Sequence, residues 1–393
     1  MKVKLSDAFD LQMGKTPPRN DRECWGDGHK WISISDIGNV GKYIDITKEE
    51  ITDIGVSKSG IKVVPKGTVI MSFKLSIGKT AITAEDMYTN EAIMAFINKG
   101  KYEINTDYLY HMCKGIDWFE GTNKAVLGLT LNKATMSEKT IEIPPMEVQL
   151  YVVSVLDKMD ELIALRKEQL AKLDQLVKSR FIELFGDPEK NTFSWKEEEL
   201  SEHLTVIGGY AFKSEQFSEE GIPVLRIGNI NSGFFKPVNL VYWEDDNALS
   251  RYKMYPGDLV MSLTGTVGKD DYGNVCILGN DYDVYYLNQR NAKLELQDTI
   301  NKYYLSMLLK FEPVKKKLTG ISRGVRQANI SNKDILNLLV PIPPIELQNQ
   351  FATFVEQTDK SKLAIQQSLD KLELLKKSLM QEYFEQGELN GKD

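Results

Sequence analysis

The chain has 393 residues, 42% of them hydrophobic, and a formal net charge of −7 at pH 7, which together predict a folded protein of two or more domains. The acidic balance excludes a protein that coats nucleic acid non-specifically, because such proteins are broadly basic, but leaves specific binding through local patches open. No apolar run approaches the length of a membrane span, no signal-peptide pattern occurs, and the three cysteines have unrelated spacings, so we expect a cytoplasmic protein without a membrane segment or a disulfide framework.

Residues 1–143 predict a compact domain of mixed α/β structure, here called domain 1. Short β-rich runs, such as residues 30–35 and 67–73, alternate with glycine and proline turns such as residues 14–18.

Residues 144–187 predict a single long helix. After Pro145, neither glycine nor proline interrupts the sequence as far as Phe185, and apolar residues recur at steps of three and four. At a rise of about 1.5 Å per residue, such a helix would be roughly 60 Å long. Pro145 suits the first turn, where a missing N–H costs nothing, and Gly186 is suited to end the helix.

The second half of the chain repeats this plan. Residues 224–230 match residues 31–37, and residues 257–262 match residues 67–72, so domain 2 (residues 188–342) should share the fold of domain 1. Pro344 opens a second long helix with its own apolar face, and residues 343–393 comprise this helix and a polar tail.

The strongest signal is a phrase at the start of both helices. Residues 143–149, Ile-Pro-Pro-Met-Glu-Val-Gln, return 199 residues later as residues 342–348, Ile-Pro-Pro-Ile-Glu-Leu-Gln, and the match continues without a gap in both directions. A duplicated unit of this size usually folds with an internal pseudo-twofold axis, which would make the two helices antiparallel partners. The alternative, in which each helix folds back on its own domain, conflicts with the expected helix length.

Two motifs resemble catalytic sites but lack essential residues. Residues 74–80 resemble a phosphate-binding loop, yet Phe73 occupies its first glycine position, so we exclude an ATP site. The Pro-Pro pairs resemble the motif that holds the target amine in adenine methyltransferases, but Ile143 and Ile342 replace its polar residue.

No set of residues indicates catalysis or metal binding. His29, His111 and His203 lack a metal-ligand spacing with cysteine, and no Ser/His/Asp or Cys/His arrangement stands out. We therefore expect no catalytic residue, bound metal or cofactor in this chain.

A paired set of basic and polar loop residues remains, and these are the candidate DNA contacts. Arginine suits guanine, asparagine and glutamine suit adenine, and lysine and hydroxyl groups commonly hold phosphates. Any one of them alone would also fit an ordinary solvated surface, but Lys79 with Lys269, and Lys124 with Arg323, place a cation in the same loop of both copies. The candidates are Lys15, Lys74, Ser76, Lys79, Asn123 and Lys124 in domain 1, and Arg226, Asn229, Thr264, Thr266, Lys269, Arg290, Ser322, Arg323, Arg326, Gln327 and Asn329 in domain 2.

Taken together, these features resemble the DNA-specificity subunits of type I restriction-modification systems. The resemblance covers essentially the whole chain. It rests on residues 3–7 with 14–17, the two copies of the phrase, residues 257–260, residues 266–269 and residues 322–331. The resemblance implies an α+β fold in which two mixed α/β target-recognition domains, related by pseudo-twofold symmetry, are joined by two long antiparallel helices that form a central coiled coil.

The resemblance also implies a function without catalysis. Each domain would read one half of a bipartite, asymmetric target in double-stranded DNA, and the helices would fix the spacing between the halves. The helices would also dock two methyltransferase subunits, which bind S-adenosylmethionine and methylate adenine N6. Motor-nuclease restriction subunits that use ATP and Mg²⁺ would join them.

Domain 1 departs from the pattern at one recognition loop. It has Leu-Gly-Leu-Thr at residues 127–130, where domain 2 has Arg-Gln-Ala-Asn at residues 326–329, so the two half-sites are expected to differ. Two rival functions remain open: a coiled-coil scaffold that binds proteins without DNA specificity, and a self-sufficient methyltransferase or nuclease.

Overall fold

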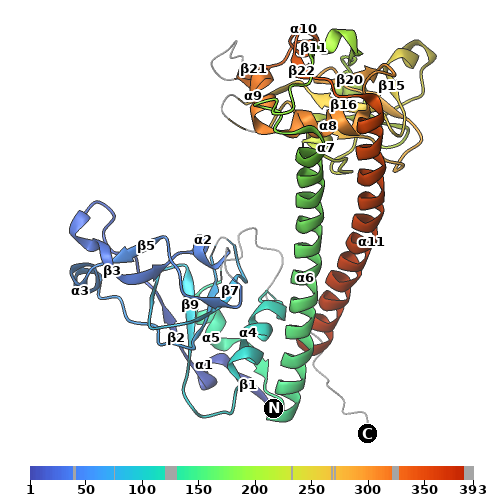
Figure 1. The fold of residues 1–393 in the computed structure, drawn as a ribbon. Helices are drawn as coiled ribbons and strands as arrows, with labels where there is room; N and C mark the ends of the chain where they lie inside the picture. Colours follow the sequence, from blue (N-terminus) through green and yellow to red (C-terminus); the bar gives the residue numbers. More distant parts are fainter. Residues whose placement is uncertain are drawn as a thin grey trace. The chain divides into compact units, whose positions relative to one another are not determined.

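The computed structural model describes residues 1–38, 41–74, 76–119, 131–231, 233–266, 269, 271–320 and 327–384. The chain forms two compact units (Figure 1): unit 1 comprises Met1–Lys167 with Gln367–Asp393, and unit 2 comprises Glu168–Gln366. Each unit therefore contains one globular domain, the first half of one long helix and the second half of the other.

Unit 1 is built on a five-stranded sheet in the order β2 (Phe9–Met13), β9 (Ile93–Asn98), β6 (Val69–Ser72), β7 (Thr80–Thr83) and β4 (Tyr43–Ile44). A second sheet has the order β5 (Glu49–Ile51), β3 (Trp25–Ile32) and β8 (Tyr88–Thr89), and β1 (Lys2–Lys4) pairs with β10 (Thr140–Glu142). The helices of the domain are α1 (Leu5–Ala8), the 3₁₀ turn η1 (Arg22–Cys24), α2 (Ile34–Ile37), α3 (Asp53–Ser59), α4 (Thr106–Gly115) and α5 (Lys133–Glu138).

Unit 2 repeats this sheet in the order β12 (Leu204–Gly208), β20 (Asn291–Leu296), β16 (Leu259–Ser262) and β18 (Val275–Ile277). Its second sheet is β14 (Tyr242–Trp243), β13 (Ile222–Leu225), β19 (Tyr285–Leu287) and β15 (Lys253–Met254), with two further pairs, β11 (Glu197–Glu199) with β22 (Leu339–Pro341) and β17 (Thr264–Thr266) with β21 (Gln327–Asn329). The helices are η2 (Leu200–Glu202), η3 (Ser214–Gln216), α7 (Ile227–Ile230), η4 (Asn247–Tyr252), α8 (Lys302–Lys310), α9 (Glu312–Thr319) and α10 (Asn332–Leu336).

The central strands β6 and β16 explain why residues 67–72 of domain 1 match residues 257–262 of domain 2. All four residues of each strand are buried. Because successive side chains point to opposite faces of a sheet, Val69 and Met71 enter the core shared with the long helix, while Ile70 enters a second core on the other face. The matching β16 divides its side chains in the same way. The common fold of the two domains is thus confirmed.

The two long helices are α6 (Met146–Phe185) and α11 (Ile345–Phe384), drawn green and red in Figure 1. In unit 1, Lys167 forms an ion pair with Glu373 at 2.8 Å and Asp160 one with Lys376, so residue numbers rise along α6 as they fall along α11. Asp174 and Lys362 pair in the same sense in unit 2, at 2.7 Å. The predicted antiparallel arrangement of the helices is confirmed.

The predicted helix boundary at Gly186 is also confirmed. Gly186 has φ +80°, a left-handed conformation that favours glycine, and its N–H donates to the Ile182 carbonyl at 2.8 Å. The polar tail after Phe384 lies outside the described residues. Within the described part of the chain, no helix is both long enough and apolar enough to cross a membrane.

The last residue of the repeated phrase is a buried glutamine that fastens each domain to its helix. Gln149 is 0% exposed. Its side-chain oxygen accepts the N–H of Asn105 at 2.8 Å, and its side-chain NH₂ donates to the backbone carbonyls of Glu103 and Pro144, both at 2.9 Å. Since Asn105 caps α4, the glutamine holds the start of α4 against the start of α6. This contact explains why the phrase ends in glutamine.

Gln348 makes the equivalent contacts in unit 2. It is also 0% exposed, accepts the N–H of Asn301 at 2.8 Å and donates to the Pro343 carbonyl at 2.8 Å. Asn301 caps α8, which corresponds to α4. In each unit, the glutamine that ends the repeated phrase therefore joins the start of the long helix to the start of a domain helix.

A second polar contact joins domain 1 to α6. Asp157 of α6 binds the Lys42 ammonium at 2.8 Å and lies 2.7 Å from Nε2 of the fully buried His111. Burial lowers the pKa of His111, although Asp157 opposes the shift. Burial tends to raise the pKa of Asp157, but hydrogen bonds from Lys42 and His111 outweigh it and lower that pKa.

Unit 1 is expected to lose stability as the pH falls below 6.5, the ordinary pKa of histidine. The folded unit keeps His111 neutral while the unfolded chain takes up a proton, so stability present above pH 6.5 is lost progressively down to the lower, folded pKa. The thermal unfolding midpoint at pH 7.5 and pH 5.5 measures this loss. His111→Gln should reduce the difference. Equal pH dependence of His111→Gln and the unmodified chain would contradict the assignment.

Candidate nucleic-acid interface

In domain 1, the tight loop between β6 and β7 displays the candidate residues. The Ser72 hydroxyl donates to the Ser76 carbonyl and accepts the N–H of Lys79 at 3.1 Å, and Gly78 has φ +87°. Lys74 and Ser76 are exposed, and Lys79 is half-buried with its ammonium beside Gly38 at the end of α2. The loop thus turns at Gly78 and exposes Lys74 and Ser76.

Lys15, the remaining described candidate of domain 1, already has partners. Its ammonium donates to the carbonyls of Ser59 and Gly60, both at 3.1 Å, at the C-terminal end of α3. A lysine there interacts favourably with the unpaired carbonyls of a helix end. Lys15 therefore ties the segment after β2 to α3.

In domain 2, a two-stranded ribbon brings together candidates that are far apart in the sequence. β17 and β21 pair antiparallel, which places Thr264 opposite Asn329 and Thr266 opposite Gln327. Thr266 and Asn329 are exposed and Thr264 is half-buried. The exposed Lys269 lies close by, because its N–H donates to the Thr266 carbonyl at 3.0 Å. Hydroxyl and amide side chains thus lie together on one ribbon, with the exposed Lys269 beside its end.

A pocket of about 510 Å³ on domain 2 is lined by three further candidates, Arg226, Asn229 and Arg290. Arg290 is exposed, and the guanidinium of Arg226 donates to the Asn239 carbonyl. The sequence did not predict that Phe212 and Phe217 line this pocket, because aromatic residues in a β-rich stretch usually belong to the hydrophobic core. The other lining residues are Phe212, Ser214, Phe217, Ile227, Gly228, Val238, Asn239, Asn288 and Gln289.

Asn229 is buried, and its side chain is engaged within the protein. It is 2% exposed, its amide donates to the carbonyls of Lys236 and Val238 at 3.0 and 2.9 Å, and its oxygen accepts the N–H of Arg226 at 2.9 Å. Asp36 occupies the same position in domain 1 and accepts the N–H of Ser33 at 2.8 Å. Both residues belong to the capping box of a short helix, a spacing visible in the sequence.

Five candidates lie outside the described residues: Asn123, Lys124, Ser322, Arg323 and Arg326. The expected match of Lys124 with Arg323 stays a prediction. For Gln327, the backbone is placed by the β21 ladder, and its side chain is not described.

An equivalent turn carries different residues in the two domains. Asn90 accepts the N–H of Ala92 at 3.0 Å, and Asn288 accepts the N–H of Arg290 at 3.2 Å. The same side-chain turn therefore carries an exposed Glu91 and a buried Ala92 in one domain, but an exposed Gln289 and an exposed Arg290 in the other. Domain 2 thus presents a cation where domain 1 presents none.

One cluster has the composition of a metal site. Glu198, Glu202 and His203 lie together, but His203 is held at Nδ1 by Thr299 at 2.8 Å and at Nε2 by Glu198 at 2.7 Å. With both ring nitrogens engaged, this histidine fits a structural role in unit 2.

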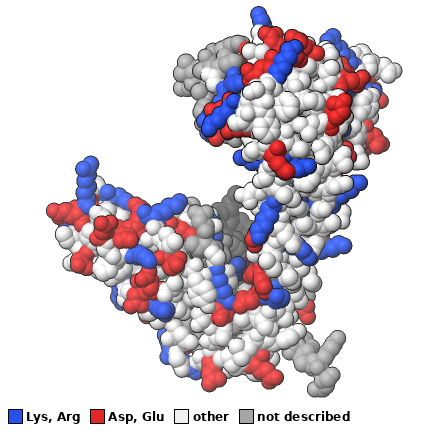
Figure 2. Space-filling model, in the orientation of Figure 1, with Lys and Arg blue, Asp and Glu red and all other residues white. Residues whose placement is uncertain are grey.

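Figure 2 shows basic and acidic side chains interleaved on the visible face of both units. This mixture agrees with the net charge of −7 and indicates that binding of a polyanion would depend on local sites.

Comparison with known proteins adds independent information. The family model described as "Type I restriction modification DNA specificity domain" matches residues 1–175 and 194–375. The MjaIX type I restriction enzyme specificity subunit of Methanocaldococcus jannaschii is 25% identical over 382 residues, covering 90% of this chain and 85% of that protein. The MjaVIII specificity subunit of the same organism is 25% identical over 400 residues, covering 96% and 90%.

Two solved structures share the fold. The crystal structure of a type I restriction-modification system S subunit from M. genitalium has a TM-score of 0.54 at 15% identity, over 98% of this chain and 96% of that one. A chain from a structure concerning complex assembly and conformational transition of the type I R-M system has a TM-score of 0.61 at 16% identity, over 97% and 96%.

Proposed function

Because the chain belongs to the family of type I restriction-modification DNA specificity proteins, we propose that it is the non-catalytic subunit that reads a bipartite, asymmetric target in double-stranded DNA. Domain 1 (residues 1–143) and domain 2 (residues 188–342) are the two target-recognition domains. The β6–β7 loop of domain 1, and the ribbon and arginine pocket of domain 2, face the DNA.

The observation that carries this proposal is the pairing of a shared scaffold with different displayed side chains. The order β2-β9-β6-β7 of one domain is matched by β12-β20-β16-β18 of the other, yet the equivalent turns carry Ala92 and Arg290. Two copies that differ at their displayed residues would read two different half-sites.

The long helices serve as the spacer and as the docking surface for two methyltransferase subunits. Leu176 and Leu375 occupy equivalent repeat positions on α6 and α11 and are 49% and 50% exposed. Matched apolar positions suit two copies of one partner. In the assembled complex, the methyltransferase subunits bind S-adenosylmethionine and the restriction subunits use ATP and Mg²⁺.

We expect the chain, co-expressed with a cognate methyltransferase subunit, to direct adenine methylation to a split motif with a fixed gap. Single-molecule sequencing of the host genome maps the methylated adenines. A continuous motif, or sequence-specific methylation that does not require this chain, would contradict the proposal. Methyl transfer by the purified chain alone would instead support a self-sufficient enzyme, and complex formation without a motif would support a protein scaffold.

A further inference from the structure

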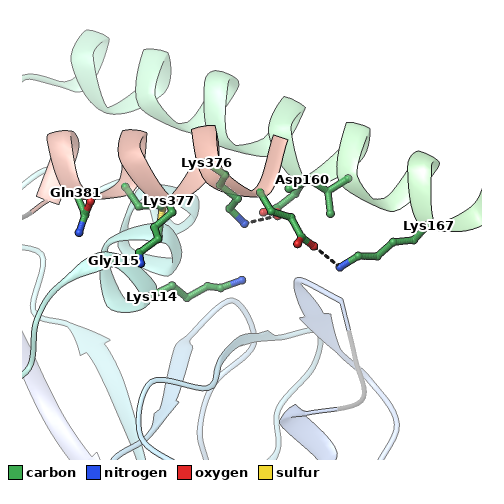
Figure 3. Close-up of a pocket in the computed structure, with 10 residues that line it drawn as sticks. Lys114, Gly115, Asp160, Lys167, Lys376, Lys377 and Gln381 are labelled. Atoms are coloured by element: carbon green, nitrogen blue, oxygen red, sulfur yellow. Dashed lines mark hydrogen bonds and ion pairs between the residues drawn. The ribbon is translucent and has the colours of Figure 1, made fainter. Parts of the chain in front are cut away.

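A hollow of about 420 Å³ lies in unit 1 where the C-terminal end of α4 meets α6 and α11 (Figure 3). We call it the lysine hollow. Its charged lining comes from three helices: Lys114 from α4, Asp160 and Lys167 from α6, and Glu373, Lys376 and Lys377 from α11.

The charges in the lysine hollow do not cancel. Lys376 pairs with Asp160 (Figure 3), and Lys167 pairs with Glu373 at 2.8 Å. Lys114 donates to the Tyr110 hydroxyl at 3.0 Å, and within the described residues neither Lys114 nor Lys377 has a carboxylate partner. Two uncompensated ammonium groups therefore share one concave surface.

The equivalent place in unit 2 is filled. Lys178 is the repeat counterpart of Lys377, and Phe311 is the counterpart of Gly115. The Phe311 ring packs 5.1 Å from the Phe181 ring, and the Lys178 ammonium lies 5.5 Å above it. At Gly115 an added Cβ would come within 2.4 Å of the Phe384 ring. Gly115 supplies no ring of this kind, and its lack of a Cβ lets the Phe384 ring pack against the end of α4.

The hollow belongs to the same packed body as the displayed loop of domain 1. Ile77 of the β6–β7 loop and Met380 of the hollow pack against one hydrophobic core. A molecule bound at Lys74 and Ser76 thus contacts the unit that carries the hollow, with α4 between the two places.

We propose that the lysine hollow binds a backbone phosphate of the target duplex, just beyond the half-site that domain 1 reads. The inference rests on the proposed function. Lys114 and Lys377 supply two point charges suited to a phosphate. The contact is independent of sequence and adds cationic binding to the domain whose equivalent turn lacks an arginine.

The double variant Lys114→Gln/Lys377→Gln, in complex with the methyltransferase partner, tests this site. Specific and non-specific DNA should both bind about 3- to 10-fold more weakly, and the slope of log affinity against log salt should fall by about 1. Fluorescence anisotropy over a salt series measures both quantities, and the methylated motif should stay unchanged. Lys178→Gln and Lys371→Gln remove one exposed lysine each outside the hollow and should leave affinity within about twofold.

A scan with single neutral methylphosphonate linkages locates the phosphate. With the unmodified chain, one position beside the domain 1 half-site should lose affinity, and the double variant should be insensitive to that same change. The absence of any such position, or equal losses from the control lysines, would overturn the proposal.

Two other results would overturn the proposal in a different way. Weaker assembly with the methyltransferase before DNA is added would indicate an acidic protein segment in the hollow, and an altered half-site would indicate base reading. If the unmodified complex showed no sequence-specific DNA binding, the proposed function itself would fail, and that outcome is distinct from all of these.

Discussion

Replacing Gln149 with alanine is expected to lower the free energy of unfolding of unit 1 by about 3 kcal/mol, because it leaves buried backbone groups without hydrogen-bond partners. The N–H of Asn105 and the carbonyl of Pro144 would lose the partner that joins α4 to α6. Gln348→Ala should have a similar effect in unit 2. Thermal and denaturant unfolding of the two variants measures the loss.

Gln175→Ala is the matched control, because it removes the same side chain from an exposed position of α6. Its effect should stay within about 0.5 kcal/mol, as is usual for surface substitutions. Gln149→Glu should remain destabilising, since a carboxylate cannot donate to two carbonyls and would be buried with its charge. If Gln149→Ala were no more destabilising than Gln175→Ala, the contacts of Gln149 would not stabilise the packing of α4 against α6.

The periodic and repeated parts of the fold were predictable from the sequence. The apolar steps of α6, its end at Gly186 and the match of residues 67–72 with residues 257–262 are local patterns, and local patterns predict helices and buried strands. The role of Gln149 was not predictable, because its partners at residues 103–105 are brought to it only by the packing of α4 against α6.

The candidate site was predictable in composition but not in arrangement. Thr264 and Asn329 were chosen as separate loop residues, and only the non-local β17–β21 pairing places them side by side. The burial of Asn229 was not predicted, because a buried and an exposed asparagine look alike in a sequence. Its spacing three residues after Arg226 matches a helix cap and was the signal that could have indicated it.

Arg290→Ala is expected to weaken specific DNA binding by about 5- to 150-fold, the loss of about 1–3 kcal/mol that accompanies removal of an arginine contacting a base. Arg290 is exposed, lines the domain 2 pocket with Arg226 and stands where domain 1 has Ala92. The methylation map should show a degenerate or lost domain 2 half-site, while the domain 1 half-site and the gap stay unchanged.

Arg290→Lys decides how the side chain acts. A lysine retains the charge but lacks the planar pair of donors, so it would largely restore a phosphate contact but not a bidentate contact with guanine. We expect Arg290→Lys to leave the half-site degenerate, as Arg290→Ala does. Arg251→Ala, at an exposed arginine of the same domain outside the pocket, should keep the motif intact. Restoration of the full motif by lysine would move Arg290 from base reading to backbone positioning, and the difference between the half-sites would then have to come from the β17–β21 ribbon.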